Sequence, residues 1–260
     1  MEPTLSLQMH GSTALVTLAR PPANALNHAL LSELVVLLRK LHEPAVRSVV
    51  LTGQGRFFSA GLDLFEVFAY PPEQAAEFAR DFDDGVSGLF ALLKPVVAAI
   101  NGHAIAGGAV LAATADFRLV CAGEAKLGIS EIQVGVPFPT SALESIRYSC
   151  AGPHLHELFY RGLSYAPAAA VERRLADEVC PPSELLPRAL ALAAELGARP
   201  TQAFATTKRA LRAEALGRMR AARITGDDPV WELWRTPETL AAMNAYRERL
   251  RRGAEIGRAH

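Results

Sequence analysis

The chain has little that would direct it to nucleic acid, to a membrane or to an oxidising compartment. Lys and Arg number 27, and Asp and Glu also number 27, so the formal net charge is zero and no overall field attracts a polyanion or an anionic surface. The three cysteines, Cys121, Cys150 and Cys180, are an odd number and lack the close spacing of zinc ligands or redox pairs. We interpret them as reduced thiols, and we expect a cytoplasmic protein without a nucleic-acid, membrane or metal partner.

The sequence also lacks an apolar run long enough to span a bilayer, and its first residues lack a basic segment followed by an apolar signal core. What it has in quantity is hydrophobic residues, which make up 50% of its 260 residues and suffice for a sizeable core. We therefore expect one core domain, residues 1–195, followed by a helical C-terminal region, residues 196–260.

Strand-like and helix-like segments alternate through the first half, which predicts an α/β fold. Between residues 29 and 41 the leucines recur at helical spacing, with charged residues on the other side. The segment 48–53 is rich in β-formers and stops at a glycine, and 96–102 repeats that arrangement after a second helical span at 71–93. Short strands are also expected at 15–18 and 119–121, and from about residue 141 the chain is expected to be mostly helical.

Two glycine-containing stretches, residues 57–64 and 101–108, are the most informative feature of the chain. Each follows a predicted strand, and in open α/β sheets ligands bind outside the carboxyl ends of the strands. Glycine permits close backbone approach and a positive φ, and two backbone N–H groups that converge on one carbonyl oxygen make an oxyanion hole. The two stretches together predict such a pair of donors.

A lone carboxylate, Glu131, lies among apolar residues in the segment Lys126–Pro139. An apolar environment raises the pKa of a carboxyl group toward neutrality, which suits a group that both removes and returns a proton. The residues alone leave a second reading open, in which Glu131 is a surface glutamate at the start of a helix.

These segments resemble the crotonase, or enoyl-CoA hydratase/isomerase, superfamily along nearly the whole chain. Five signatures occur in the family's order: residues 58–64, residues 94–102, residues 106–108, Asp116 and residues 128–131. The resemblance implies a ClpP/crotonase-like spiral of ββα units, and trimers or paired trimers built through the helical C-terminal region. It also implies an acyl-CoA thioester as substrate, with CoA entering as part of the substrate and no separate cofactor.

Mapped onto this sequence, the family's oxyanion-hole donors are the backbone N–H groups of Leu62 and Gly107, and its catalytic base is Glu131. The same mapping assigns contacts with the acyl-CoA to one loop together with Gly107. The loop residues are Ser59, Ala60, Gly61, Leu62, Asp63 and Leu64.

One position departs from the hydratase pattern. Hydratases of the family carry a second glutamate three positions after the hole-forming glycine, and here that position is Val110. Valine can neither hydrogen-bond a water molecule nor transfer a proton, so the chain resembles the Δ3,Δ2-enoyl-CoA isomerases of fatty-acid degradation, which use one carboxylate. The segment Gly135–Pro139 also resembles isomerases more than hydratases. The alternatives are an enoyl-CoA hydratase, another thioester chemistry of the fold, and a non-catalytic acyl-CoA-binding protein.

Four further features also bear on the site. Asp63 either contacts CoA or caps a helix, and Asp116 is expected to tie loops together. We expect His103 to pack rather than to transfer a proton. The basic residues of the last helix, Arg247, Arg249, Arg251 and Arg252, form either a solvated face or a partial contact with CoA phosphates across a subunit boundary.

Overall fold

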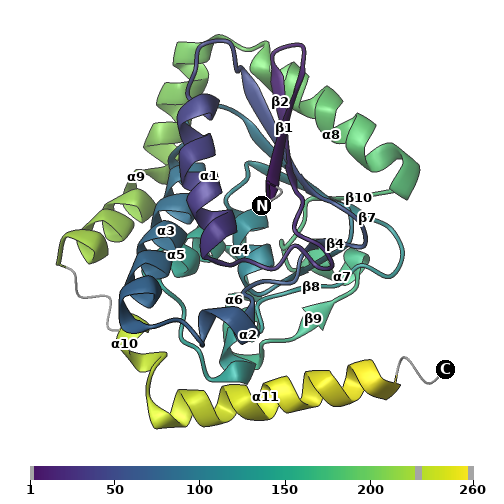
Figure 1. Cartoon of the computed structure of the whole chain (residues 1–260). Coiled ribbons are helices and arrows are strands. Elements are labelled where there is room, and N and C mark those ends of the chain that lie inside the picture. The colour runs from purple at the N-terminus through teal and green to yellow at the C-terminus, as the bar shows by residue number, and fades with distance from the viewer. Residues whose placement is uncertain (1–2, 226–229, 257–260) are drawn as a thin grey trace.

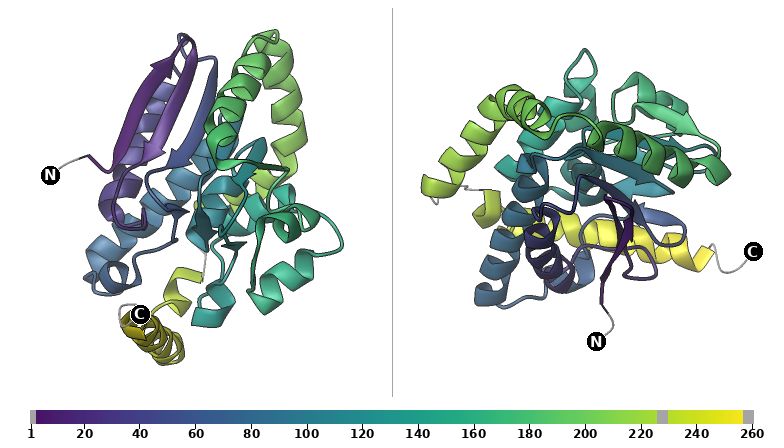
Figure 2. Two further views of the ribbon diagram at one scale, coloured as in Figure 1. Left: turned by 90° about the vertical axis from the view of Figure 1, so that its right-hand side faces the viewer. Right: turned by 90° about the horizontal axis from the view of Figure 1, so that it is seen from above.

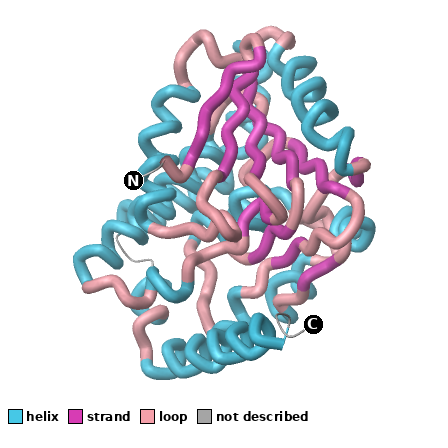
Figure 3. The backbone as a smooth tube through the Cα atoms, turned by 45° about the vertical axis from the view of Figure 1, so that its right-hand side comes forward, coloured by secondary structure: helices cyan, strands magenta, loops and turns pink. Residues whose placement is uncertain are grey.

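The computed structural model describes residues 3–225 and 230–256. Within them the central feature is a six-stranded sheet in the order β1-β2-β3-β5-β7-β10 (Figures 1 and 3). Strands β1 and β2 form an antiparallel hairpin, and the neighbours from β2 onward are parallel. The strands span Leu5–His10, Thr13–Leu18, Ser48–Gly53, Val96–Ile100, Phe117–Cys121 and Glu178–Cys180.

A second, four-stranded sheet has the order β4-β6-β8-β9. Its strands are Phe57–Ser59, His103–Ile105, Leu127–Gly128 and Ser164–Tyr165. Strand β3 of the large sheet is followed by β4 of the small one, β5 by β6, and β7 by β8. The two glycine stretches were expected as loops after strands, but each also contributes a short strand to this second sheet, which brings them side by side.

The helices surround these sheets. Helix α8 (Pro182–Gly197) packs on strands β2, β3, β5 and β7, whereas α1 (His28–Leu41) lies on the other side of the sheet and packs on α3 (Pro72–Ala91), as Figure 2 shows. The remaining helices are α2 (Leu64–Val67), α4 (Gly107–Ala113), α5 (Thr140–Ser149), α6 (Leu155–Arg161), α7 (Pro167–Glu172), α9 (Thr201–Thr225), α10 (Val230–Leu233) and α11 (Pro237–Ile256), with a 3-10 turn, η1, at Glu131–Val134.

The sequence pattern explains these elements. Every residue of β5 is buried, as expected for a parallel strand covered on both faces. Helix α3 forms in the predicted helical span, and its apolar stripe, namely Phe78, Phe82, Val86, Leu89 and Phe90, is buried. The half of the chain expected to be mostly helical also contains β9 and β10, which are too short to give a strand pattern.

Helices α9 and α11 make up most of the C-terminal region. Helix α9 packs against α5 and α3, whereas α11 crosses the lower end of the molecule and packs against η1 (Figure 1). In residues 3–225 and 230–256, no helix has the length and apolar character needed to cross a membrane.

Candidate active site

The two glycine stretches meet at Gly61 and Gly107. Gly61 has φ +83°, and a Cβ atom placed on it would lie 2.7 Å from the carbonyl oxygen of Ile105 and 3.1 Å from the nitrogen of Gly107. A Cβ on Gly108 would lie 2.2 Å from the carbonyl oxygen of Ser59. Both positions therefore require glycine, because any side chain would push the two loops apart.

The backbone around Leu62 is held by hydrogen bonds that leave its own N–H free. Leu26 donates to the carbonyl oxygen of Gly61 over 2.8 Å, and Asp63 donates to that of Leu26 over 2.9 Å. The Ser59 hydroxyl donates to the carbonyl oxygen of Asn24 over 2.8 Å and accepts from the Gly61 N–H. In the described part of the chain, the Leu62 N–H donates no hydrogen bond.

The second predicted donor, Gly107, is the first residue of α4, so its N–H has no acceptor within the helix. The preceding residue, Ala106, has φ +49° and ψ −123°, a conformation that costs a non-glycine residue about 1–3 kcal/mol. Its N–H donates to the carbonyl oxygen of Gly128 over 2.8 Å. Among the described residues, Gly107 N–H also donates no hydrogen bond, so the structure brings two free N–H groups to adjoining loops.

The small sheet carries the segment of Glu131 next to strand β6, which leads into Gly107. Strand β8 pairs with β6 so that Gly128 faces Ile105, and Glu131 begins η1 three residues later. The residue is 8% exposed, and its Oε2 atom has no hydrogen-bond partner among the described residues. The alternative of a surface glutamate is wrong.

Burial raises the pKa of the Glu131 carboxyl from 4.5 to about 8, and a hydrogen bond from its own backbone N–H opposes that rise only in part. A carboxyl group with a pKa near neutrality can accept a proton and return it without a large free-energy difference between the two forms. A buried polar atom without a partner is costly to a folded protein, and it is the arrangement that proton transfer requires.

The other loop residues assigned to acyl-CoA have structural partners within the chain. Ser59 is fully buried, Ala60 N–H donates to the carbonyl oxygen of Ala23 over 2.9 Å, and Leu64 begins α2. Asp63 is the N-cap of that helix, and its carboxylate accepts hydrogen bonds from Phe65 N and Glu66 N. The predicted capping role of Asp63 is thus confirmed, and its contact with CoA stays a prediction.

The structure adds a polar network that the sequence reasoning missed. The Arg20 guanidinium lies 2.9 Å from both Asp63 and Glu66, and the Asn27 amide donates to Glu66 over 3.0 Å. Tyr70 donates to Glu66 over 2.8 Å. Asp63 followed by Glu66 three residues later is the sequence signal for a helix start that could have located part of this network. The network fixes the segment directly after Leu62.

Asp116 has the structural role predicted for it, although it joins a helix to a strand rather than two loops, and His103 packs as predicted. Asp116 accepts from Val96 N over 2.8 Å, from Lys208 over 2.7 Å and from Arg212 over 2.8 Å, which ties α9 to the large sheet. His103 packs against the Phe57 ring with centroids 4.9 Å apart, and burial lowers its pKa.

The C-terminal helices close the loop that carries Glu131. The Trp234 indole donates to the carbonyl oxygen of Pro137 over 3.0 Å, and the Thr239 hydroxyl donates to that of Gly135 over 3.1 Å. Nothing in the sequence signals these contacts, because about a hundred residues separate the partners. Arg247 lies 4.6 Å above the ring of the exposed Phe65, so this residue of the basic helix contacts α2. The side chains of Arg249, Arg251 and Arg252 lie outside the described residues.

The sequence profile of one family, described as enoyl-CoA hydratase/isomerase, matches residues 8–252. The chain belongs to the enoyl-CoA hydratase/isomerase family. Members of this family form the crotonase superfamily that the five signatures predict, and the mixed α/β architecture with parallel sheets agrees with that fold.

Curated relatives of this enoyl-CoA hydratase/isomerase family protein include the carnitinyl-CoA dehydratase of Proteus mirabilis, which is 32% identical over 215 residues and 82% of each chain. Among solved structures, human mitochondrial Δ3,Δ2-enoyl-CoA isomerase superposes with a TM-score of 0.91 at 26% identity, over 96% of this chain and 99% of the human one. The enoyl-CoA isomerase of Mycobacterium tuberculosis superposes with a TM-score of 0.79 at 28% identity, over 85% and 96% of the two chains.

Proposed function

We propose that this protein is a Δ3,Δ2-enoyl-CoA isomerase that uses Glu131 as its one proton-transferring group. The observation that carries the proposal is the buried, unpartnered Oε2 atom of Glu131, on the segment that the small sheet holds beside the free N–H groups of Leu62 and Gly107. At the position where family hydratases have a second glutamate, Val110 is fully buried.

The proposed reaction begins with the thioester oxygen of a 3-enoyl-CoA accepting hydrogen bonds from the Leu62 and Gly107 N–H groups. The Glu131 carboxylate removes a proton from the α-carbon, and the C–H electrons move into a dienolate whose charge rests on the thioester oxygen. Glu131 then returns the proton to the γ-carbon, the double bond moves to the α,β position, and the carboxylate is regenerated. In other enzymes one such donor contributes about 2.7–4 kcal/mol of transition-state stabilisation.

The environment of Glu131 suits proton return more than water addition. A carboxyl group whose pKa is about 8 holds its proton long enough to deliver it to the γ-carbon. The apolar side chain of Val110 offers no hydrogen bond to a water molecule that would add across the double bond. The reaction requires no metal or redox cofactor, because the thioester and the two donors supply the electrophilic assistance.

A second candidate is hydration or dehydration of an enoyl-CoA, and the relationship to carnitinyl-CoA dehydratases at 32% identity favours it. In that reaction Glu131 would have to activate water without a second carboxylate at position 110. We therefore place this activity second.

Ultraviolet absorbance separates these candidates. Mixing the protein with 3-hexenoyl-CoA raises the absorbance of the conjugated enoyl thioester if it is an isomerase, whereas mixing it with crotonyl-CoA lowers that absorbance if it is a hydratase. We expect the rise with 3-hexenoyl-CoA, and we expect Glu131→Ala to abolish it while retaining CoA-thioester binding by calorimetry. Binding without turnover of either substrate by the unaltered protein would favour a non-catalytic acyl-CoA-binding role.

We also propose that the protein assembles as a trimer or a pair of trimers through residues 196–260, as the crotonase resemblance implies. Analytical ultracentrifugation should give a mass of three or six times 27.9 kDa. A monomer at micromolar concentration would contradict this assembly.

A further inference from the structure

One arginine bonds both to the loop that follows Leu62 and to the segment that lies against that loop. The Arg20 guanidinium donates through Nη1 to the carbonyl oxygen of Ala25 over 3.1 Å. Its Nη2 atom lies 2.9 Å from the carboxylates of both Asp63 and Glu66. The Arg20 side chain is only 23% exposed, so these charge-assisted bonds are partly shielded from water. Arg20 therefore joins two segments that are far apart in the chain.

The bond to Ala25 continues toward the Leu62 N–H through two peptide groups. The carbonyl of Ala25 and the N–H of Leu26 belong to one peptide group, and that N–H donates to the carbonyl oxygen of Gly61 over 2.8 Å. The carbonyl of Gly61 and the N–H of Leu62 belong to a second peptide group. Both groups are trans, and in a planar trans peptide the C=O and the N–H point in opposite directions. The Leu26 bond thus turns the Leu62 N–H away from residue 26.

This chain of bonds can strengthen the last donor as well as aim it. Hydrogen bonds in sequence polarise one another, and a bond from a cation is stronger than one from a neutral donor. The backbone is also held on the other side of Leu62, because the Asp63 N–H donates to the carbonyl oxygen of Leu26 over 2.9 Å. Since Arg20 bonds to the Asp63 carboxylate as well, it holds the backbone both before and after Leu62.

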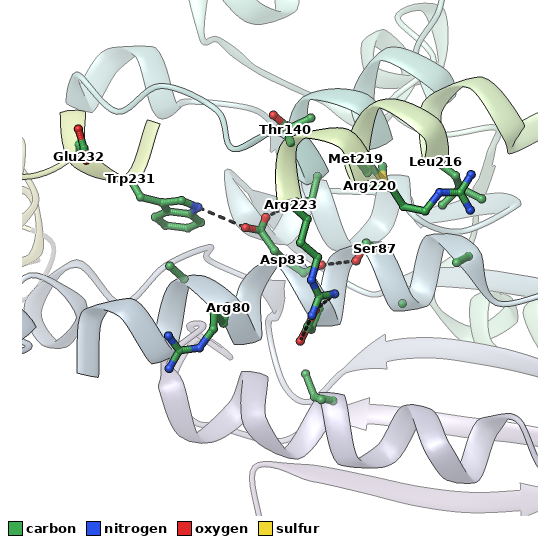
Figure 4. Close-up of a pocket in the computed structure, with 17 residues that line it drawn as sticks. Arg80, Asp83, Ser87, Thr140, Leu216, Met219, Arg220, Arg223, Trp231 and Glu232 are labelled. Carbon is green, nitrogen blue, oxygen red and sulfur yellow. Dashed lines mark hydrogen bonds and ion pairs between the residues drawn. The ribbon is translucent and has the colours of Figure 1, made fainter. Parts of the chain in front are cut away.

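Other arginines pair with carboxylates without reaching these loops. Figure 4 shows Arg223 of α9 beside a cavity of about 690 Å³, where its guanidinium pairs with Asp84 of α3. Arg118 of β7 pairs with Asp177, directly before β10, over 2.8 Å. In the described part of the chain, neither arginine bonds to residues 20–27 or 60–66. These two pairs join structural elements, whereas the bonds of Arg20 lead to a candidate donor.

We propose that Arg20 is a positioning residue for the oxyanion hole, which aims and polarises the Leu62 N–H through the peptide groups of residues 25–26 and 61–62. This inference rests on the proposed acyl-CoA function. The effect belongs mainly to the transition state, because the negative charge on the thioester oxygen grows as the dienolate forms. Loss of the guanidinium should therefore lower kcat more than it changes KM.

The central variant is Arg20→Met, which keeps an unbranched stem and removes the guanidinium. With 3-hexenoyl-CoA we expect kcat to fall about 10- to 100-fold, part of the roughly 10²–10³-fold that one oxyanion-hole donor contributes elsewhere, while KM changes less than about threefold. The matched control is Arg118→Met, which breaks the pair with Asp177 and should lower stability without changing kcat. Circular dichroism and urea unfolding give the folded fraction to which each rate refers.

A double variant separates the bonds of Arg20 from its charge. Arg20→Met leaves the carboxylates of Asp63 and Glu66 without their cation, and uncompensated negative charge would itself oppose a developing anion. Arg20→Met/Glu66→Gln restores the net charge of the three side chains but not the bond to Ala25. We expect the double variant to be as slow as Arg20→Met. Recovery of kcat would mean that only the charge balance matters, and it would overturn the inference.

Infrared spectroscopy tests the same role without turnover. The probe is hexanoyl-CoA with a carbon-13 label at the thioester carbonyl, bound to each protein. Two aligned donors lower the carbonyl stretching frequency below its value in water. We expect Arg20→Met to move the bound frequency back toward that value and Arg118→Met to leave it unchanged. If Arg20→Met does not fold, Arg20→Lys replaces it, because an ammonium group keeps the charge but lacks the planar fork.

The outcomes of these measurements are distinct. An Arg20 variant with either the kcat or the bound frequency of the unaltered protein overturns the inference and leaves the isomerase assignment intact. A bound frequency in the unaltered protein equal to that in water contradicts the oxyanion hole and, with it, the role of Arg20. A lowered frequency without turnover of any 3-enoyl-CoA contradicts the isomerase assignment, and the infrared data then decide the role of Arg20 alone.

Discussion

Glu131 and Asp116 are two carboxylates of one protein, and their hydrogen-bonding surroundings are opposite. Asp116 accepts from a backbone N–H, from the buried Lys208 and from the buried Arg212. Glu131 keeps one oxygen without any partner in the described part of the chain, and its pKa is raised to about 8. A carboxylate that is surrounded by hydrogen-bond donors stabilises the structure, whereas a carboxylate without such donors can accept a proton.

The same comparison holds for the groups around each acid. Burial lowers the pKa of Lys208 to about 8, and the nearby Asp116 carboxylate opposes that fall. The surroundings of Glu131 include no such cation partner in the described residues. The experiments below test this difference between the two acids.

The largest effect is expected from Glu131→Gln, which removes the proposed proton-transferring group and keeps its shape. Turnover of 3-hexenoyl-CoA should fall by about 10²–10⁴-fold, the usual contribution of a general acid–base group, while the melting temperature at pH 7 does not fall. Absorbance kinetics and circular dichroism measure the two. A clear drop in melting temperature would indicate that Glu131, like Asp116, stabilises the folded structure.

Asp116→Asn should have the opposite effect, with lower stability and unchanged turnover. Removing one partner of a buried ion network leaves Lys208 and Arg212 uncompensated and should lower the free energy of unfolding by about 3 kcal/mol, measured by urea unfolding. The control is Glu195→Gln, because Glu195 pairs with Arg199 on the exposed surface and should cost about 0.5 kcal/mol or less. Turnover per folded molecule should stay unchanged in Asp116→Asn, and a loss of turnover in fully folded protein would contradict its structural role.

The raised pKa of Glu131 should also appear in the pH dependence of stability. The folded state keeps the carboxyl protonated up to about pH 8, whereas the unfolded state loses that proton near pH 4.5. The contribution of this group to stability is therefore complete below pH 4.5 and is lost as pH rises toward 8, by up to about 1.4 kcal/mol per pH unit. Glu131→Gln should become more stable than the unaltered protein across that window, measured by urea unfolding at pH 5, 6, 7 and 8.

The same ionisation should govern activity. Because only the carboxylate can remove a proton, kcat/KM for 3-hexenoyl-CoA should rise with pH and level off above about pH 8. A profile that is flat from pH 5 to 9, together with equal stability curves for the Glu131→Gln and unaltered proteins, would mean that the carboxyl ionises normally.

The smallest effect is expected at Asp63, which is intermediate between the two acids. Asp63→Ala removes the N-cap of α2 and should lower the free energy of unfolding by about 1 kcal/mol. Asp63→Asn keeps the cap and loses only the ion pair with Arg20, which still pairs with Glu66, so it should cost about 0.5 kcal/mol or less. If the residue only caps the helix, Asp63→Asn leaves KM for the CoA thioester unchanged. A rise in KM with unchanged stability would show that its charge acts on the ligand.

The sequence was sufficient for the parts of this fold that depend on local patterns. Helix α1 and strand β3 follow from leucine spacing and from a β-branched run that ends at Gly53, and the glycine stretches correctly predict close backbone approach at Gly61 and Gly107. The burial of Glu131 depends on packing from elsewhere in the chain, so the residues around it left a surface position open. The bonds from Trp234 and Thr239 could not be predicted, because no local pattern specifies which distant carbonyl a side chain will reach.

The two hydrogen bonds from Trp234 and Thr239 to the loop of Glu131 can form only late in the synthesis of the chain. Leu62 and Gly107 are translated and can pair their loops long before residues 234 and 239 leave the ribosome. A nascent chain can therefore pair the loops of Leu62 and Gly107 early but fixes the loop of Glu131 only at the end. The last segment to be made is thus the one that completes the candidate site.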